Sequence, residues 1–287
     1  MYQTKERIYF YHAYALALGG FVASDGERQN IDSAAATVLS VAGGSGHVRQ
    51  TGYRFFRCGK NSEKNFYIRL EDAQSEVVGF ETAEGYTTRS RTTLRGLDIN
   101  GIVKADLVES ALESHHAGTS CERREEPQIH ILDSHFEGLT VDGVEVKPTR
   151  NDAFDHYPTY GGLRALVDGQ LDDNDERARV LRPRLRAASL MDLPDEPTPP
   201  SYAIDLSERY VSPHIIRCSI FDELATDGKL DTLGYSIAVP DFGRVFLGEL
   251  LVTHGMKRLN MIRFDLGCTY SGGGTSGGAS VNGEPTP

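Results

Sequence analysis

Histidine and cysteine residues are concentrated between positions 115 and 135, where they could bind a metal ion. A zinc site needs three or four such side chains that converge at about 2.0–2.3 Å from the ion. Adjacent strands joined by a hairpin could supply them, but their spacing is that of no known zinc motif. In a regular strand, two residues five positions apart, such as His130 and His135, point to opposite faces. We therefore interpret these residues as surface or hydrogen-bonded side chains and keep a metal site as the alternative. Its candidate ligands are His115, His116, Cys121, His130 and His135.

A second group of polar side chains follows at residues 151–160. An aspartate and a histidine in this group could act as general acid and base, and loops on a β scaffold often carry function. No nucleophile or substrate-binding group can be identified beside them, so the sequence predicts no catalytic constellation. The catalytic candidates are Asp152, Asp155 and His156.

Two literal glycine motifs occur near the C-terminal end, G-x-S-x-G at residues 274–278 and G-x-G-x-x-G through residues 272, 274 and 277. A nucleophile elbow needs a strand, a turn and a helix, and a dinucleotide loop needs a helix N-terminus. No helical pattern follows either motif, so we expect neither to act and predict no cofactor. The composition of residues 271–287 is instead typical of a mobile Gly/Ser-rich tail, unless a partner holds it.

The elements that would position these groups are predicted to be strands. From Ile8 to Leu18 the large residues fall on even positions with alanines between them, which is the two-residue period of a strand. Short β-favouring runs separated by glycine and polar turns follow as far as residue 80. The sequence therefore predicts an all-β or β-dominated α+β fold, arranged as an antiparallel sandwich or a partly closed barrel.

The strongest local signal is a pair of similar segments, residues 96–103 and 138–146. Both are predicted hairpins that turn on Asn-Gly or Asp-Gly, because a type I′ turn requires positive φ at its two central residues. The similarity is either a structural repeat or a coincidence of turn chemistry, and the sequence does not decide between them.

The composition changes after residue 148. Residues 149–200 carry most of the helical signal, with short helices predicted at Leu163–Val167 and Asp175–Leu181, and they end in a proline-rich stretch. We interpret this region as a small helical insertion in a β domain. The predicted parts are a first β core at 1–148, the insertion at 149–200, C-terminal strands at 201–270 and the tail at 271–287.

The formal net charge of −11 disfavours nucleic acid and anionic membrane surfaces as partners. Five arginines between residues 177 and 186 form the densest basic stretch, but they follow an acidic run, which is typical of a solvated helix. No apolar stretch is long enough for a membrane span, and no secretion signal is recognised. The sequence therefore predicts a cytoplasmic protein.

The cysteines are widely separated and form no C-x-x-C pair, which excludes the common zinc and thioredoxin motifs. Reduced, partly buried thiols are expected in the cytoplasm, whereas export would allow two disulfides in any of three pairings. The residues concerned are Cys58, Cys121, Cys218 and Cys268.

Four blocks of the chain resemble segments shared by uncharacterised bacterial proteins of similar length. They are residues 9–20, which end in the sequence ALGG, residues 94–108, residues 134–143 and above all the block GRVFLGELLV at 243–252. The resemblance implies a β-rich fold and brings no activity, cofactor or site residue with it.

The function hypothesis that follows is a non-enzymatic binding or self-assembling structural protein, expected to be a homo-oligomer. The reason for this hypothesis is that long terminal strands would leave backbone groups unpaired at a sheet edge. Proteins must cover or pair such edges. One alternative is an isomerase or cyclase with an apolar barrel cavity and the insertion as a lid. Another is a carbohydrate-binding module that uses exposed tyrosines.

Overall fold

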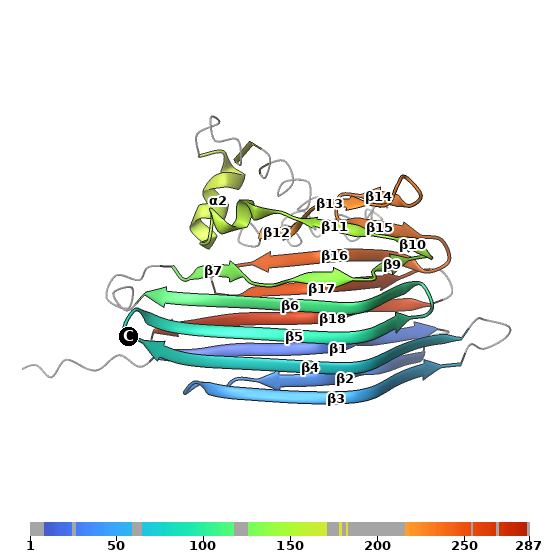
Figure 1. The fold of residues 1–287 in the computed structure, drawn as a ribbon, viewed down its shortest axis with the longest axis horizontal. Coiled ribbons are helices and arrows are strands. Elements are labelled where there is room, and N and C mark those ends of the chain that lie inside the picture. The colour runs from blue at the N-terminus through green and yellow to red at the C-terminus, as the bar shows by residue number, and fades with distance from the viewer. Residues whose placement is uncertain are drawn as a thin grey trace, which may run out of the picture.

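Two antiparallel sheets packed face to face form the body of the protein in the computed structural model (Figure 1). Sheet A has the order β14-β15-β16-β17-β18-β1-β2, with β12 beside β16. Sheet B has the order β10-β9-β6-β5-β4-β3, with β7 and β8 beside β6. Neither sheet closes on itself, so the antiparallel sandwich is confirmed and the partly closed barrel is not formed. The structure describes residues 9–24, 27–58, 65–117, 126–170, 178–179, 182, 216–253, 255–267 and 270–285.

The strands differ widely in length, from two residues in β9 and β10 to 17 in β4. Sheet A consists of β1 (Tyr9–Ser24), β2 (Glu27–Val38), β12 (Ile216–Ser219), β14 (Asp231–Leu233), β15 (Ser236–Val239), β16 (Gly243–Val252), β17 (Lys257–Leu266) and β18 (Ser271–Pro285). Sheet B consists of β3 (Gly44–Arg57), β4 (Phe66–Thr82), β5 (Gly85–Ile99), β6 (Val103–Ala117), β7 (Gln128–Ile131), β8 (His135–Glu137), β9 (Thr140–Val141) and β10 (Val144–Glu145).

The C-terminal segment is a central strand of sheet A, so the prediction of a mobile tail is wrong. β18 pairs with β17 on one side and with β1 on the other. Its glycines allow close packing, because a Cβ atom on Gly274 would lie 2.6 Å from the Cζ atom of Phe264 and 2.8 Å from the carbonyl oxygen of Gly19. Glycine in this strand therefore marks a close approach of ring and backbone rather than a flexible chain.

The two sheets approach each other closely at the centre of the sandwich. β1 presents Ala13, Ala15 and Ala17 inward, and all three are buried. From the opposite sheet, the hydroxyl of Ser90 on β5 donates a hydrogen bond of 2.8 Å to the carbonyl oxygen of Tyr14. A gap lined by such small side chains leaves no room for large ones. The predicted strand is confirmed, but its large even-numbered residues as far as position 16 lie toward the outer face.

One transverse row of residues in each sheet interrupts the alternation of inward and outward side chains. In sheet B the row contains Gly52, Gly96 and Gly138, with φ angles of 66°, 63° and 60°. In sheet A it contains Gly248 and Gly277, with φ angles of 65° and 66°. The strands keep their pairing register across both rows, so no extra residue is inserted; each left-handed glycine instead turns the following side chains to the other face. Glycine adopts this backbone without the strain that a Cβ atom would cause. The long strands are bent in Figure 1.

The two similar hairpin segments have the same backbone geometry at their turns. Asn100 and Gly101 have φ angles of 55° and 72°, and Asp142 and Gly143 have 49° and 74°, as type I′ turns require. The backbone N–H of Asp142 donates to the carbonyl oxygen of Ile102 at 2.8 Å, so the two turns are neighbours. The strands differ, since the first turn joins strands of 15 residues and the second joins strands of two. The two segments therefore share the turn geometry and the left-handed glycine before each turn, Gly96 and Gly138.

A two-stranded sheet and an α-helix follow the second hairpin. The small sheet consists of β11 (Lys147–Arg150) and β13 (Phe221–Ala225), and the 3₁₀-helix η1 spans Asp152–Asp155. Helix α2 (Tyr160–Asp168) begins after Thr159, whose Oγ1 accepts a hydrogen bond from the backbone of Gly162. It ends at Gly169 in the left-handed conformation.

Helix α2 confirms the first helix predicted for the insertion. The second predicted helix lies mostly outside the described residues, and so does the proline-rich stretch. No helix among the described ranges combines the length and the apolar character needed to cross a membrane.

Candidate functional site

On one side of the row of Gly52, Gly96 and Gly138, the outer face of sheet B carries charges that alternate in sign from strand to strand. Ion pairs join neighbouring strands: Nε of Arg49 lies 2.7 Å from Oδ1 of Asp72, and Nη2 of Arg89 lies 2.6 Å from Oε2 of Glu113. Opposite charges on adjacent strands stabilise a sheet. We call these four rows the charge columns. They comprise His47 and Arg49 on β3, Asp72 and Glu76 on β4, Arg89, Arg91 and Arg95 on β5, and Glu109 and Glu113 on β6. Beyond the glycine row this order of signs is not kept, because Arg54 on β3 lies opposite Arg69 on β4.

A cleft of about 650 Å³ opens on this face, where β5 and β6 meet the segment after β7 and the junction of β11 with η1. We call it the sheet B cleft. Segments far apart in the sequence supply its lining, and most of the lining side chains are ionisable. They are Arg89, Arg91, Glu113, His130, Asp133, Arg150 and Asp155.

Neighbouring groups hold the arginines of the cleft in fixed positions. Nη2 of Arg150 donates to the carbonyl oxygen of Ile131 at 2.7 Å and lies 3.3 Å from Oδ1 of Asp155. Arg91 pairs through Nη2 with Glu109. Arg89 directs both Nε and Nη2 to one carboxylate oxygen of Glu113.

In Arg89 and Arg91 of β5, these ion pairs leave some guanidinium N–H groups available to bind a ligand. Within the described part of the chain, Nη1 of Arg89 and both Nε and Nη1 of Arg91 have no hydrogen-bond partner. The two residues are separated by one position in a strand, so both point to the same face, about 7 Å apart. Fixed guanidinium donors at this spacing suit a carboxylate or phosphate group.

One catalytic candidate lies in the cleft. Asp155 lines it, and its carboxylate forms the ion pair with Arg150. Asp152 begins η1, and His156 is exposed directly after η1 ends. The role that the geometry gives to Asp155 is to hold Arg150 against the end of β7.

The candidate metal ligands lie on both faces of sheet B. His115 points outward, with Nδ1 at 3.1 Å from Oγ1 of Thr87, whereas His116 is buried and its ring centre lies 5.1 Å from that of Tyr9. β7 ends before β8 begins at His135, so the strand is not regular, and His130 and His135 pair with residues that both face outward. Among the described residues, no three His, Cys, Asp or Glu side chains converge. Cys121 lies outside these residues.

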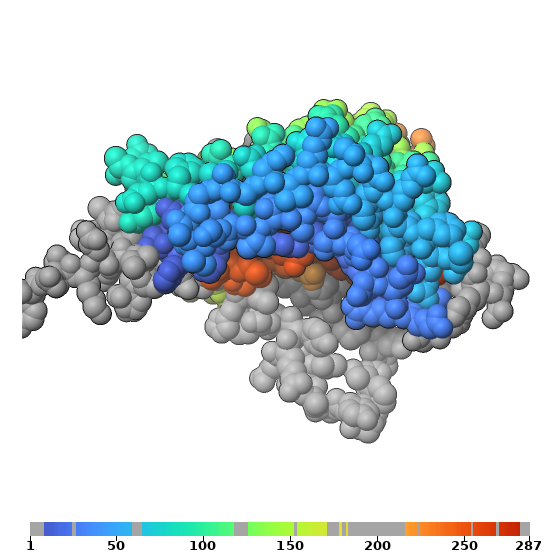
Figure 2. All heavy atoms as spheres, turned by 90° about the horizontal axis from the view of Figure 1, so that it is seen from below, coloured from blue at the N-terminus to red at the C-terminus, as the bar shows by residue number. Residues whose placement is uncertain are grey.

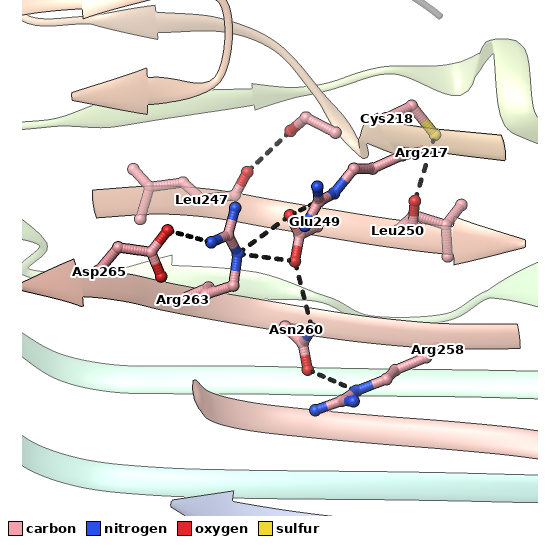
Figure 3. A network of polar contacts seen from close by, with 10 residues as sticks. Arg217, Cys218, Leu247, Glu249, Leu250, Arg258, Asn260, Arg263 and Asp265 are labelled. Atoms are coloured by element: carbon pink, nitrogen blue, oxygen red, sulfur yellow. Dashed lines mark hydrogen bonds and ion pairs between the residues drawn. The ribbon is translucent and has the colours of Figure 1, made fainter. Parts of the chain in front are cut away.

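A buried ion-pair network lies on the outer face of sheet A (Figure 3). Glu249 on β16 is 1 % exposed and accepts hydrogen bonds from Nε of Arg217 at 2.8 Å and from Nε of Arg263 at 3.0 Å. Nδ2 of Asn260 lies 3.5 Å from the same carboxylate, and the guanidinium of Arg263 lies 3.6 Å from the ring centre of Phe246. The network joins β12, β16 and β17, and we interpret it as structural.

Burial raises the pKa of the Cys218 thiol, and the negative charge of Glu249 adds to the effect. Its Sγ donates to the carbonyl oxygen of Leu250 at 3.7 Å. A thiol reacts as the thiolate, so burial disfavours reaction at Cys218. Cys58 is exposed, and both cysteines are free. Cys121 and Cys268 lie outside the described residues.

Lys257, the first residue of β17, points inward and is fully buried. Its Nζ atom has no hydrogen-bond partner in the described part of the chain. Desolvation lowers the pKa of Lys257 from 10.5 to about 8, although the negative charge of Glu126 acts in the opposite direction. A buried ammonium of this kind lowers the stability of the fold.

Replacing Lys257 with methionine is therefore expected to raise the free energy of unfolding at pH 7, by up to about 3 kcal/mol. Between pH 8 and pH 10.5 the unfolded wild-type chain binds more protons than the folded one, so wild-type stability rises with pH. The advantage of the variant should shrink over that window. Urea unfolding of both proteins at several pH values measures the difference. A constant difference would contradict the prediction, and replacing the exposed Lys229 with methionine is the control.

The sequence-based analysis missed the arginines of the cleft and the buried glutamate. Arg89, Arg91 and Arg95 occupy alternate positions of one strand face, and this two-residue spacing is visible in the sequence. Glu249 is the one acidic residue in the apolar block at 243–252. An acidic side chain inside an apolar strand is a signal for a buried ion pair.

A family model described as a domain of unknown function (DUF8256) matches residues 9–253. The match ends before β17 and β18, and it agrees with the resemblance to proteins that have no assigned activity. No curated protein and no solved structure matches the chain.

Proposed function

The chain belongs to DUF8256, a domain of unknown function, and we propose from its geometry that it is a non-enzymatic binding protein. The sheet B cleft holds a small molecule that carries a carboxylate or phosphate group. Arg89 and Arg91 anchor this group, and Arg150 with His130 contact the rest of the ligand. Charge-assisted hydrogen bonds from guanidinium groups are well suited to such an anchor.

The observation that carries this proposal is the set of guanidinium N–H groups on β5 that point into the cleft without an internal partner. The ion pairs to Glu109 and Glu113 fix the two side chains before any ligand arrives. Fixing them in advance lowers the conformational entropy that binding would otherwise cost. The acidic residues Asp133 and Asp155 would favour a ligand that also carries hydroxyl or amino groups.

A thermal-shift screen tests the proposal with mono- and dicarboxylates, phosphate monoesters and the neutral amides of the same carboxylates. We expect acids to raise the melting temperature and their amides not to. For the best acid, replacing Arg91 with glutamine should weaken binding about 10- to 100-fold, since a hydrogen bond to a charged group contributes about 1.5–3 kcal/mol. Calorimetric titration measures this loss.

The matched control replaces Arg28 with glutamine, because Arg28 is exposed on β2 in the other sheet. This variant should bind the acid as tightly as the wild type. Equal binding by the Arg91 variant, or equal shifts with acids and amides, would remove the proposal.

The two alternative functions have less support. An isomerase or cyclase with an apolar cavity would need a closed, apolar pocket beside Asp155 or His156, whereas the cleft beside Asp155 is open and lined by charges. A carbohydrate site on tyrosines would need exposed, coplanar rings. The stacked pair of Tyr9 and Tyr86 contributes to the core instead, since Tyr9 is buried.

The sequence-based hypothesis also included self-assembly, argued from unpaired terminal strands, and the structure does not leave these strands unpaired. The terminal strands β1 and β18 pair with each other inside sheet A and leave no open edge there. An open edge remains at β3, where basic side chains would favour an acidic strand over a second copy of β3. Light scattering over a wide concentration range tests for a homo-oligomer, and a constant monomer mass would contradict it.

The proposed setting is the cytoplasm, without nucleic acid as a partner. The free, exposed thiol of Cys58 fits a reducing compartment. The arginines of β5 lie between acidic columns on β4 and β6, which reduces their attraction for phosphate backbones.

A further inference from the structure

Among the described strands, β3 forms a long open edge of sheet B. This strand of 14 residues pairs with β4 on one side, and sheet B ends there. Figure 2 looks onto this edge, where the blue segments of β2 and β3 lie across the side of the molecule that faces the viewer. Within the described ranges, no hydrogen bond reaches the backbone of β3 from the side away from β4.

Backbone groups of the neighbouring edge strand β2 form hydrogen bonds with side chains of β3. Gln50 of β3 accepts a hydrogen bond from the backbone of Ala35 at 3.1 Å, and the hydroxyl of Tyr53 donates to the carbonyl oxygen of Asp32 at 2.9 Å. The buried Arg57 donates to the carbonyl oxygen of Glu27 at 3.1 Å. Side chains of β3 thus satisfy backbone groups along β2, which blocks strand addition to sheet A at this edge.

The charge columns determine which strand fits beside β3. On the side of the glycine row that contains Arg49, the columns alternate from β6 to β3 as acidic, basic, acidic and basic. The next strand in this order would be acidic. Like charges directly opposite each other destabilise a strand pair, so a second copy of β3, with its own basic column, is disfavoured.

Two exposed apolar side chains lie along the same strand. Phe56, on the outer face, is 54 % exposed, and Val48, on the inner face, is 37 % exposed. An added strand that alternates acidic and apolar residues would pair its acids with His47 and Arg49 and cover Val48 with an apolar side chain.

We infer that the edge of β3 binds an extended acidic segment of a partner protein, which pairs with it as an additional antiparallel or parallel strand. Backbone hydrogen bonds along β3 give the affinity, and the basic column gives the selectivity. This inference is independent of the sheet B cleft, because it uses β3 rather than the arginines of β5.

Fluorescence anisotropy tests the inference with a labelled ten-residue peptide in which glutamate alternates with valine. The first matched peptide carries lysine in place of every glutamate. The second keeps the glutamates but has every second backbone amide N-methylated. At low ionic strength we expect the glutamate peptide to bind the whole chain at least about ten-fold more tightly than either matched peptide. Hydrogen exchange should slow in β3 when the glutamate peptide is bound.

A charge-reversal variant separates recognition from folding. Replacing Arg54 with glutamate puts the new carboxylate opposite Arg69 on β4, so the sheet can accept it, and replacing Arg49 with glutamine removes a second basic group. The double variant should lose the preference for glutamate and bind the lysine peptide instead. The control, Lys104→Glu, changes an exposed residue of β6 and should keep the wild-type preference.

Three results would overturn the inference. The first is equal binding of the glutamate and lysine peptides, or binding of neither. The second is unchanged binding of the N-methylated peptide, which would exclude strand pairing. The third is a concentration-dependent dimer in light scattering with β3 protected from exchange in the absence of peptide, which would assign the edge to a second copy of the chain.

Discussion

Replacing Gly274 with valine is expected to destabilise the protein by about 3 kcal/mol or more, the upper range for overpacking a rigid core. The added Cβ atom would lie 2.6 Å from the ring of Phe264 and 2.8 Å from the carbonyl oxygen of Gly19. Neither neighbour can move freely, because Phe264 is fully buried and Gly19 belongs to the paired strand β1. For a domain of this size the melting temperature should fall by roughly 6–12 °C.

A substitution that has space around it provides the control. Gly267 is outside the strands, and a Cβ atom there would meet its nearest neighbour at 3.7 Å, an ordinary contact. Gly267→Ala is therefore expected to change the melting temperature little. If residues 271–287 were a mobile tail, Gly274→Val would be equally harmless, so calorimetry of the two variants distinguishes a central strand from a tail.

Replacing Glu249 with glutamine is expected to cost about 3–5 kcal/mol, the usual effect of removing one partner of a buried ion pair. The carboxylate compensates Arg217 and Arg263, which are 19 % and 15 % exposed, and a neutral amide of the same shape cannot do so. Asp265 would still pair with Arg263 in this variant. Denaturant unfolding followed by circular dichroism measures the loss.

The control for this variant is Glu145→Gln. Glu145 also forms an ion pair, at 3.1 Å from Nζ of Lys147, but both side chains are mostly exposed. Surface pairs of this kind contribute about 0–1 kcal/mol. Equal losses for the two variants would show that the network around Glu249 does not stabilise the fold.

The cleft was predictable only in part. Arg89 and Arg91 share a strand face because of their spacing, which is readable from the sequence alone. Asp155 was selected as a candidate for its residue type and its place at the start of the insertion. That Arg150 lies between Asp155 and the end of β7 depends on hydrogen bonds to carbonyl oxygens of Ile131 and Leu132, and no local pattern encodes these. The sequence predicts no catalytic constellation around Asp155, and the role that we propose for the cleft is anion binding.

The sequence by itself determined the local geometry of this protein. Two-residue alternation gave the strands, and Asn-Gly and Asp-Gly gave both type I′ turns, because side-chain direction and positive φ are properties of a few consecutive residues. The acidic net charge is likewise independent of the fold.

Only the tertiary structure decided which face of each strand is buried and which strands are neighbours. The alanines of β1 face inward because β5 presents small hydroxyl side chains about 75 residues away, as the hydrogen bond from Ser90 to Tyr14 shows. The glycine-rich C-terminal segment is a central strand because β1, about 250 residues or more earlier, pairs with it. Burial and pairing are properties of two distant segments together, so neither segment reveals them alone.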